Sequence, residues 1–121
     1  MKKIIIHHSG NHNTKELIYF LHVDKYKWEN IGYHFLITKK GKIEKGRNIT
    51  QEGAHCLGQN KDSIGICLLG NLDYEQPSKE QLITLNKLIK ELNIKDIKLH
   101  RDYCDKTCPG KNFKRKMIDV I

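Results

Sequence analysis

A chain of 121 residues can form one domain around a single hydrophobic core, which excludes a second folded module. Hydrophobic residues make up 38% and charged residues 30%, with only two prolines, so the composition is that of a globular chain and not of a disordered one. The formal net charge of +8 predicts attraction to polyanions, a class that includes nucleic acids, anionic lipids and the phosphate-rich polymers of a bacterial cell wall. Charge alone does not choose among them.

The N-terminal residues do not have the pattern of an export signal. The start MKKIII has two lysines and three isoleucines, but histidines follow at once and interrupt the apolar run of roughly seven or more residues that a signal peptide needs. We also expect no transmembrane segment. The chain is therefore expected to be made in the cytoplasm and to depend on another factor for release.

Residues 3–8 (KIIIHH) are predicted to form a strand, because three consecutive isoleucines are β-branched and the run is too short for a helix. Side chains alternate along a strand, so Ile4, Ile6 and His8 face one way while Ile5 and His7 face the other. Only one of the two histidines can therefore face a given site. The polar residues 9–13 that follow are predicted to form a loop.

A short helix is predicted after this loop. Asn13 stands three residues before Glu16, which is an asparagine version of the capping box. The apolar positions that would form the buried stripe of this helix are Leu17, Ile18, Phe20 and Leu21. His12 and His22, in the loop and the helix, are expected to lie on the surface.

The middle of the chain alternates between strand and helix patterns. Residues 31–47 read as a β-hairpin with Gly41 in its turn, and residues 63–69 as a buried strand. Ser78 and Gln81 form a second capping box, for a helix of about four turns that ends at Leu92.

The last third of the chain completes the predicted topology. Residues 96–99 are expected to form a further strand, and a terminal helix is expected from about Asn112, with Phe113, Met117 and Ile118 against the core. Strands interspersed with helices in this order predict an α/β fold, a single domain with a mixed central β-sheet flanked by helices.

The loop at residues 99–110 (LHRDYCDKTCPG) carries a histidine, a lysine and two cysteines. Thiolate and imidazole are ligands that zinc prefers, and a catalytic zinc keeps three protein ligands and leaves a fourth position for water. If the first and last strands are neighbours, His7 and His100 can reach one point, and a cysteine of the loop can return to it. Spacing alone leaves both Cys104 and Cys108 open as the sulfur ligand.

The chain has two further cysteines, Cys56 and Cys67. Four cysteines could form two disulfides in a secreted protein, but in a reducing compartment cysteines near histidines are more often metal ligands or buried thiols. We favour the second interpretation, with Cys56 and Cys67 as small apolar residues. Cys104 remains open: it could be a substitute ligand, an oxidation-prone neighbour of the metal or a buried thiol.

Four motifs in order carry a resemblance to a known family. They are IIIHHS, NIGYHFLITKKGKIEKGR, GAHCLGQNKDSIGICLLGN and LHRDYCDKTCPG. In order and spacing they resemble the zinc-dependent N-acetylmuramoyl-L-alanine amidases, a family that includes small phage lysozymes and is similar to the peptidoglycan recognition proteins. The resemblance extends from Ile4 to about Phe113. It implies one amidase catalytic domain over residues 1–121.

The resemblance also implies site residues. The family's zinc ligands fall on His7, His100 and Cys108, which favours His7 over His8 and Cys108 over Cys104. The family's catalytic tyrosine falls on Tyr33 and the lysine of the phage enzymes on Lys106. A histidine that lines the family's substrate groove falls on His55. His34 alternates away from Tyr33 on its strand and is expected to be structural.

The reaction that the resemblance implies is hydrolysis of the amide between N-acetylmuramic acid and L-alanine in bacterial peptidoglycan, by a phage or prophage endolysin. Zinc can lower the pKa of bound water from 15.7 to about 7, and Lys106 could stabilise the oxyanion by roughly 3 kcal/mol. Tyr33 could orient the water or donate to the intermediate. The alternative is a non-catalytic peptidoglycan-binding module of the same fold.

The expected partner is therefore the peptidoglycan substrate. Basic residues are scattered with few aromatic residues between them, and no nucleic-acid-binding motif is found, so we expect no nucleic-acid partner. We further expect no membrane association and a monomer.

Overall fold

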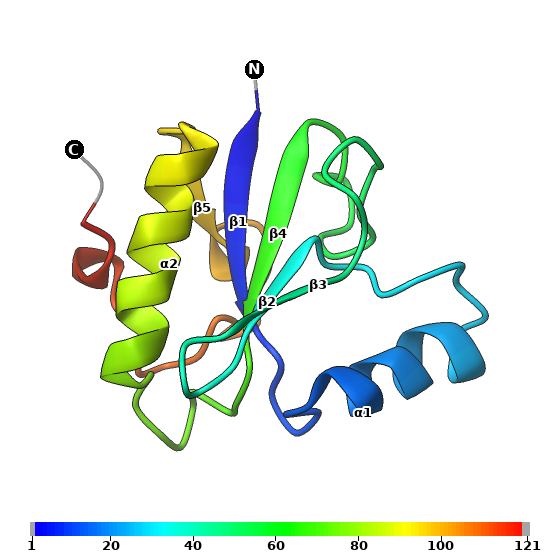
Figure 1. Ribbon diagram of the computed structural model, residues 1–121, viewed down its shortest axis with the longest axis horizontal. Helices are drawn as coiled ribbons and strands as arrows, with labels where there is room; N and C mark the ends of the chain where they lie inside the picture. Colours follow the sequence, from blue (N-terminus) through cyan, green and yellow to red (C-terminus); the bar gives the residue numbers. More distant parts are fainter. Residues whose placement is uncertain (1, 120–121) are drawn as a thin grey trace.

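The centre of the computed structural model, which describes residues 2–119, is a five-stranded sheet in the order β3-β2-β4-β1-β5 (Figure 1). The strands are β1 (Lys3–His8), β2 (Phe35–Ile37), β3 (Ile43–Lys45), β4 (Ser63–Leu68) and β5 (Ile97–Leu99). β1 lies between β4 and β5 and is parallel to both, β2 is parallel to β4, and β3 is antiparallel to β2. The predicted mixed sheet and the predicted hairpin are confirmed.

Helical segments lie on both sides of this sheet. They are α1 (Lys15–Tyr19), which continues into the π-helical turn η1 (Phe20–Lys25), α2 (Lys79–Leu92), and the 3-10 turns η2 (His100–Asp102) and η3 (Arg115–Met117). Figure 1 shows α2 running beside β1 and β5, and α1 at the opposite end of the molecule. Across residues 2–119, no helix has both the length and the apolar character needed to cross a bilayer.

The alternation predicted for β1 separates the two faces of the sheet. Ile4 and Ile6 belong to the core cluster that also contains Leu85 and Ile89 of α2. A second cluster on the other face brings Ile18 of α1 together with residues of the sheet and its connections, namely Ile31, Leu36, Cys67 and Leu69, with Tyr33 packed against them. His7 therefore faces the side opposite α2.

The helix predicted at residues 78–92 has the expected ends. The Ser78 hydroxyl oxygen accepts from the Gln81 N–H at 3.0 Å, and the Gln81 side-chain oxygen accepts from the Ser78 N–H at 3.0 Å. Gln81 is fully buried, and its amide nitrogen donates to the carbonyl oxygens of Ile37 and Leu69. One glutamine thus closes the capping box and joins α2 to the sheet.

The first helix differs from the prediction. Its N-cap is Thr14 and not Asn13, because the Thr14 hydroxyl accepts from the Leu17 N–H at 3.1 Å. Of the expected apolar stripe only Ile18 is buried, while Leu17 is 44% and Phe20 59% exposed. The helix continues as a π-helical turn. The apolar stripe is predicted from the 3.6-residue period of an α-helix, and a π-helix does not have this period.

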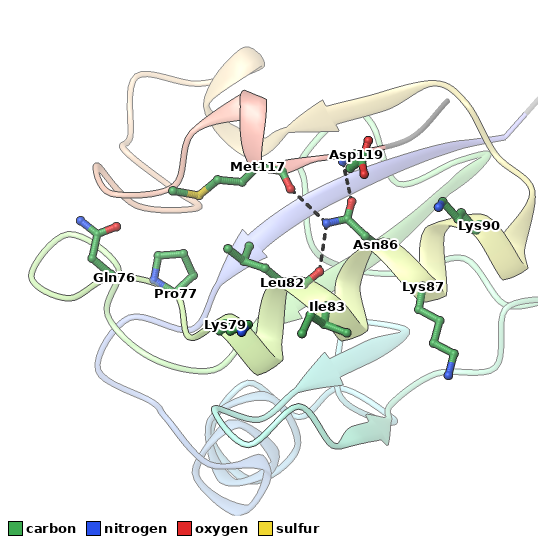
Figure 2. A pocket seen from close by; sticks show the side chains of 10 residues that line it. All are labelled: Gln76, Pro77, Lys79, Leu82, Ile83, Asn86, Lys87, Lys90, Met117 and Asp119. Atoms are coloured by element: carbon green, nitrogen blue, oxygen red, sulfur yellow. Dashed lines mark hydrogen bonds between the residues drawn. The ribbon is translucent and has the colours of Figure 1, made fainter.

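The prediction of a terminal helix from about Asn112 is wrong, because the only helical turn in this segment up to residue 119 is the 3-10 turn η3. The Arg101 guanidinium donates to the carbonyl oxygens of Gly110 and Phe113 at 2.9 and 2.7 Å, so backbone groups that a helix would use are bonded elsewhere. In Figure 2 the Asn86 side chain donates to the Met117 carbonyl and accepts from the Asp119 N–H, which ties this segment to α2. Phe113 is nonetheless fully buried, as expected.

Candidate active site

His7 and His100 come together because β1 and β5 are parallel neighbours. Ile6 of β1 pairs with Leu99 of β5. The residues that follow them, His7 and His100, therefore lie side by side at the same edge of the sheet. The Nδ1 atoms of the two imidazoles lie 3.2 Å apart. His7 is 1% exposed, and its ring is 4.6 Å from the His100 ring, centre to centre.

Cys108 is returned to these histidines by the loop after η2. Its Sγ lies 3.9 Å from His7 Nδ1 and accepts from the His8 backbone N–H at 3.4 Å. The Arg101 N–H donates to the Cys108 carbonyl at 2.8 Å. Gly110 allows the loop to close, since it has a φ of +112° and a Cβ at this position would lie 2.4 Å from Leu72 Cβ.

The donor atoms of His7, His100 and Cys108 all lie within 4.8 Å of one another, a spacing that fits a metal ion. Donors bound to one tetrahedral zinc are about 3.4–3.6 Å apart, given metal–ligand bonds of about 2.0–2.3 Å. Burial lowers the pKa of His7 and, to a lesser extent, that of His100, which leaves their nitrogen lone pairs available. Burial raises the pKa of Cys108 to about 12, and a bound cation would favour its thiolate. The donor set therefore fits zinc.

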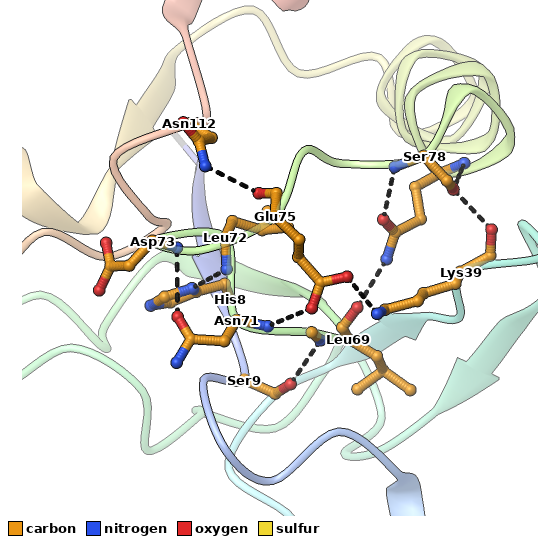
Figure 3. Close-up of polar contacts among 12 residues, drawn as sticks. His8, Ser9, Lys39, Leu69, Asn71, Leu72, Asp73, Glu75, Ser78 and Asn112 are labelled. Carbon is orange, nitrogen blue, oxygen red and sulfur yellow. Dashed lines mark hydrogen bonds and ion pairs between the residues drawn. The ribbon is translucent and has the colours of Figure 1, made fainter.

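His8 and Cys104 lie outside this group of donors. Figure 3 shows the His8 ring turned toward the loop after β4, where its Nδ1 accepts from the Leu72 N–H at 3.0 Å. The Cys104 thiol points to the His100 carbonyl oxygen at 3.6 Å. All four cysteines are free thiols, and Cys56 and Cys67 are buried, as expected.

Tyr33 lies beside the donor group, with its ring centre 5.1 Å from that of His7. Burial raises the pKa of its phenol well above the ordinary value, and the neighbouring Cys67 and Cys108 thiols act in the same direction. The Tyr33 hydroxyl consequently remains protonated at neutral pH. It can donate a hydrogen bond to a negative oxygen.

Lys106 is exposed on the same loop as Cys108. Burial is the main cause of the lowered pKa of His100, and the positive charge of Lys106 is a secondary one. A lysine ammonium close to the donor group can stabilise an anionic oxygen there.

His55 lies directly behind His7. Its Nδ1 is 2.9 Å from His7 Nε2, on the opposite side of the His7 ring from the nitrogen that faces His100. The Asn60 side-chain oxygen accepts from the backbone N–H groups of His55 and Cys56 at 2.8 and 2.9 Å and so holds the loop that presents this ring.

His55 also lines a hollow of about 330 Å³ next to the donor group. Its walls are formed by His22, Trp28, Tyr33, Ala54, His55, Cys56, Leu57 and Asn60. A larger hollow of about 640 Å³ lies between α2 and the C-terminal segment (Figure 2). No residue of the donor group lines either hollow, but the Tyr33 and His55 rings of the smaller one lie beside His7, with ring centres 5.1 and 4.9 Å from that of His7. The smaller one is therefore the candidate substrate site.

The expectation that His22 lies on the surface is wrong. It is 7% exposed, its Nδ1 accepts from the Gly32 N–H at 3.0 Å, and its ring contacts those of Trp28 and Tyr33. Burial, with Arg47 as a secondary cause, lowers the pKa of His22 to about 4. His34 has the expected structural position, since it donates to the Gln51 carbonyl and accepts from the Gly65 N–H.

Comparison with known families matches residues 1–111 to the N-acetylmuramoyl-L-alanine amidases. The chain belongs to this family. Among solved structures, the N-acetylmuramoyl-L-alanine amidase LysC from Clostridium intestinale superposes with a TM-score of 0.87 at 35% identity, over 97% of this chain and 81% of that one. The amidase-type fold expected from the sequence is thereby confirmed.

Sequence relatives include phage and insect proteins. The endolysin of Klebsiella phage KP32 is 34% identical over 97 residues, which is 73% of this chain and 64% of that endolysin. Peptidoglycan-recognition protein SC2 of Drosophila melanogaster is 32% identical over 125 aligned residues, covering 90% of this chain and 68% of that protein. The chain thus matches somewhat less than two thirds of the length of the phage endolysins.

Proposed function

We propose that this chain is a zinc-dependent amidase that hydrolyses the bond between N-acetylmuramic acid and L-alanine in bacterial peptidoglycan. The observation that carries the proposal is the approach of His7, His100 and Cys108 to within 4.8 Å of one another in a chain of the amidase family. The catalytic domain would extend over residues 1–121, and the matched phage relative is named an endolysin. We infer the same role in phage or prophage lysis, on the cell wall after release from the cytoplasm.

His7, His100 and Cys108 would hold the zinc ion. When bound, zinc lowers the pKa of water and polarises a carbonyl, which are the two requirements for hydrolysing an amide near neutral pH. Two imidazoles and one thiolate would supply three protein ligands, the number found in catalytic rather than structural zinc sites.

Tyr33 and Lys106 would stabilise the negative charge that develops on the amide oxygen during attack. The Tyr33 hydroxyl is held protonated by burial and can donate, and the Lys106 ammonium supplies a positive charge from the exposed loop. Donors of this type are typically worth about 3 kcal/mol of transition-state stabilisation. The muropeptide would occupy the hollow lined by His55, which makes His55 a substrate contact as well.

A recognition module without catalysis is the second candidate, because peptidoglycan-recognition proteins are among the relatives. Retention of the complete donor group, with Cys108 in place, favours the enzyme. The net charge of +8 suits an anionic cell wall, and we propose a monomer with peptidoglycan as its partner and no nucleic acid.

The test is digestion of purified peptidoglycan with analysis of both possible products. The proposal predicts new N-terminal alanine groups without new reducing sugar ends, loss of this activity on treatment with a strong zinc chelator, and recovery when zinc is returned. New reducing ends would indicate a glycosidase. Sedimentation with peptidoglycan and no release of alanine termini would favour the recognition module.

A further inference from the structure

A row of hydrogen bonds leads from His7 away from the donor group into the protein. His7 Nε2 lies 2.9 Å from His55 Nδ1, His55 Nε2 lies 3.3 Å from the Ser63 hydroxyl, and that hydroxyl donates to the Gln59 carbonyl at 2.6 Å. The three side chains are 1%, 9% and 6% exposed. Ser63 is the first residue of β4 and the register partner of Lys3, the first residue of β1.

The carbonyl at the end of this row sets the direction of every bond in it. A carbonyl oxygen only accepts, and a serine hydroxyl has one proton, so Ser63 uses its proton on Gln59 and accepts from His55 Nε2–H. A neutral His55 that carries its proton on Nε2 has a bare Nδ1, which accepts from His7 Nε2–H. The unprotonated nitrogen of His7 is then Nδ1, the atom that faces His100 and Cys108.

We propose that His55 and Ser63 are positioning residues that hold His7 in the tautomer and ring orientation required of a metal ligand. The inference rests on the proposed zinc site, and it gives His55 a role that does not depend on substrate. Hydrogen bonds to the second nitrogen of a ligating histidine typically change metal affinity by about 10- to 100-fold when they are removed.

The backbone leaves room for the His55 ring at two glycines. A Cβ on Gly65 of β4 would lie 2.7 Å from the His55 Cγ, and a Cβ on Gly53 would lie 2.5 Å from its Cδ2. Any larger residue at either position would displace the ring. Together with the two backbone hydrogen bonds that Asn60 accepts, this close fit holds His55 in one place.

The test measures zinc affinity by competition with a chromophoric chelator, without substrate. His55→Leu removes the acceptor for His7 and should weaken zinc binding about 10- to 100-fold. Ser63→Ala, which removes only the far end of the row, should weaken it less. His55→Asn retains an oxygen near the Nδ1 position and should restore binding to within a few-fold of wild type. His22→Asn, at a buried histidine that lines the same hollow, is the matched control and should bind zinc like wild type.

The result separates this inference from the proposed function. If wild type binds no stoichiometric zinc, the proposed function fails. If wild type binds zinc and releases alanine termini, but His55→Leu binds zinc equally well and only its KM rises, His55 is a substrate contact and the positioning role is wrong. Long-range ¹H–¹⁵N spectra of wild type give a second measurement that needs no variant: His7 should carry its proton on Nε2, and a proton on Nδ1 would overturn the inference.

Discussion

The Nδ1 atoms of His7 and His100 lie 3.2 Å apart although 93 residues separate them in the chain. They meet because β5 joins the sheet last in sequence but pairs directly with β1, the first strand. Neither histidine could hold a metal with the other before this pairing forms. Completion of the sheet therefore also completes the donor group.

The two adjacent histidines of β1 should behave differently on substitution. His7→Ala should empty the zinc site, because His7 contributes a donor atom to the group. His8→Ala should retain zinc and instead lose about 1–3 kcal/mol of stability, because the Leu72 N–H loses its acceptor. Zinc content by atomic absorption and urea unfolding separate the two effects. If His8→Ala lacks zinc and His7→Ala contains it, the assignment of the two histidines to the faces of β1 is reversed.

Lys106→Ala should reduce turnover on peptidoglycan by about 10²- to 10³-fold, because a charge that stabilises the oxyanion is removed. Its zinc content should equal that of wild type, since Lys106 is not a donor. Lys111→Ala changes a second lysine, the residue that directly follows this loop, and serves as the control, with turnover close to wild type. Loss of zinc from Lys106→Ala would mean that the lysine has a structural role instead.

The protein should lose stability in mild acid, in part through His22. The unfolded histidine has a pKa of 6.5 and the folded one about 4, so the unfolded state binds the proton first. The contribution of His22 is therefore fully present above about pH 6.5 and is lost as the pH falls toward 4. We expect this loss to be on the order of 2 kcal/mol.

His22→Asn isolates this contribution, because an asparagine oxygen can still accept from the Gly32 N–H but does not titrate. Urea unfolding of both proteins at several pH values and equal zinc concentration gives the difference in stability, in which the other histidines cancel. This difference should narrow as the pH falls from 6.5 to 4. A constant difference would show that His22 does not titrate with a lowered pKa.

Regular elements were predictable from local sequence patterns. The alternation in residues 4–8 assigned His7 and His8 to opposite faces, and the pair Ser78 and Gln81 located the start of α2, since both signals depend only on neighbouring residues. The π-helical turn of η1 has no such local signal, and for that reason the burial of His22 was missed. The sequence contains one indication that His22 is buried. Two aromatic residues, Tyr26 and Trp28, follow it closely, and their rings lie near the His22 ring.

The site was only partly predictable because its contacts are long-range. Spacing in the loop at residues 99–110 allowed either Cys104 or Cys108 to reach the histidines, and the approach of Cys108 Sγ to His7 Nδ1 joins residues that are 101 positions apart in the chain. The position of His55 behind His7 depends on Gly53 and Gly65, two glycines whose common role is visible only in three dimensions.

The most direct test of the zinc-dependent mechanism compares Cys108→Ala with Cys104→Ala, measuring zinc per chain and release of alanine termini from purified peptidoglycan on the same preparations. We expect Cys108→Ala to lose both zinc and activity, because it lacks the thiolate donor, and Cys104→Ala to retain both. Full activity in zinc-free Cys108→Ala would contradict the metal-dependent mechanism.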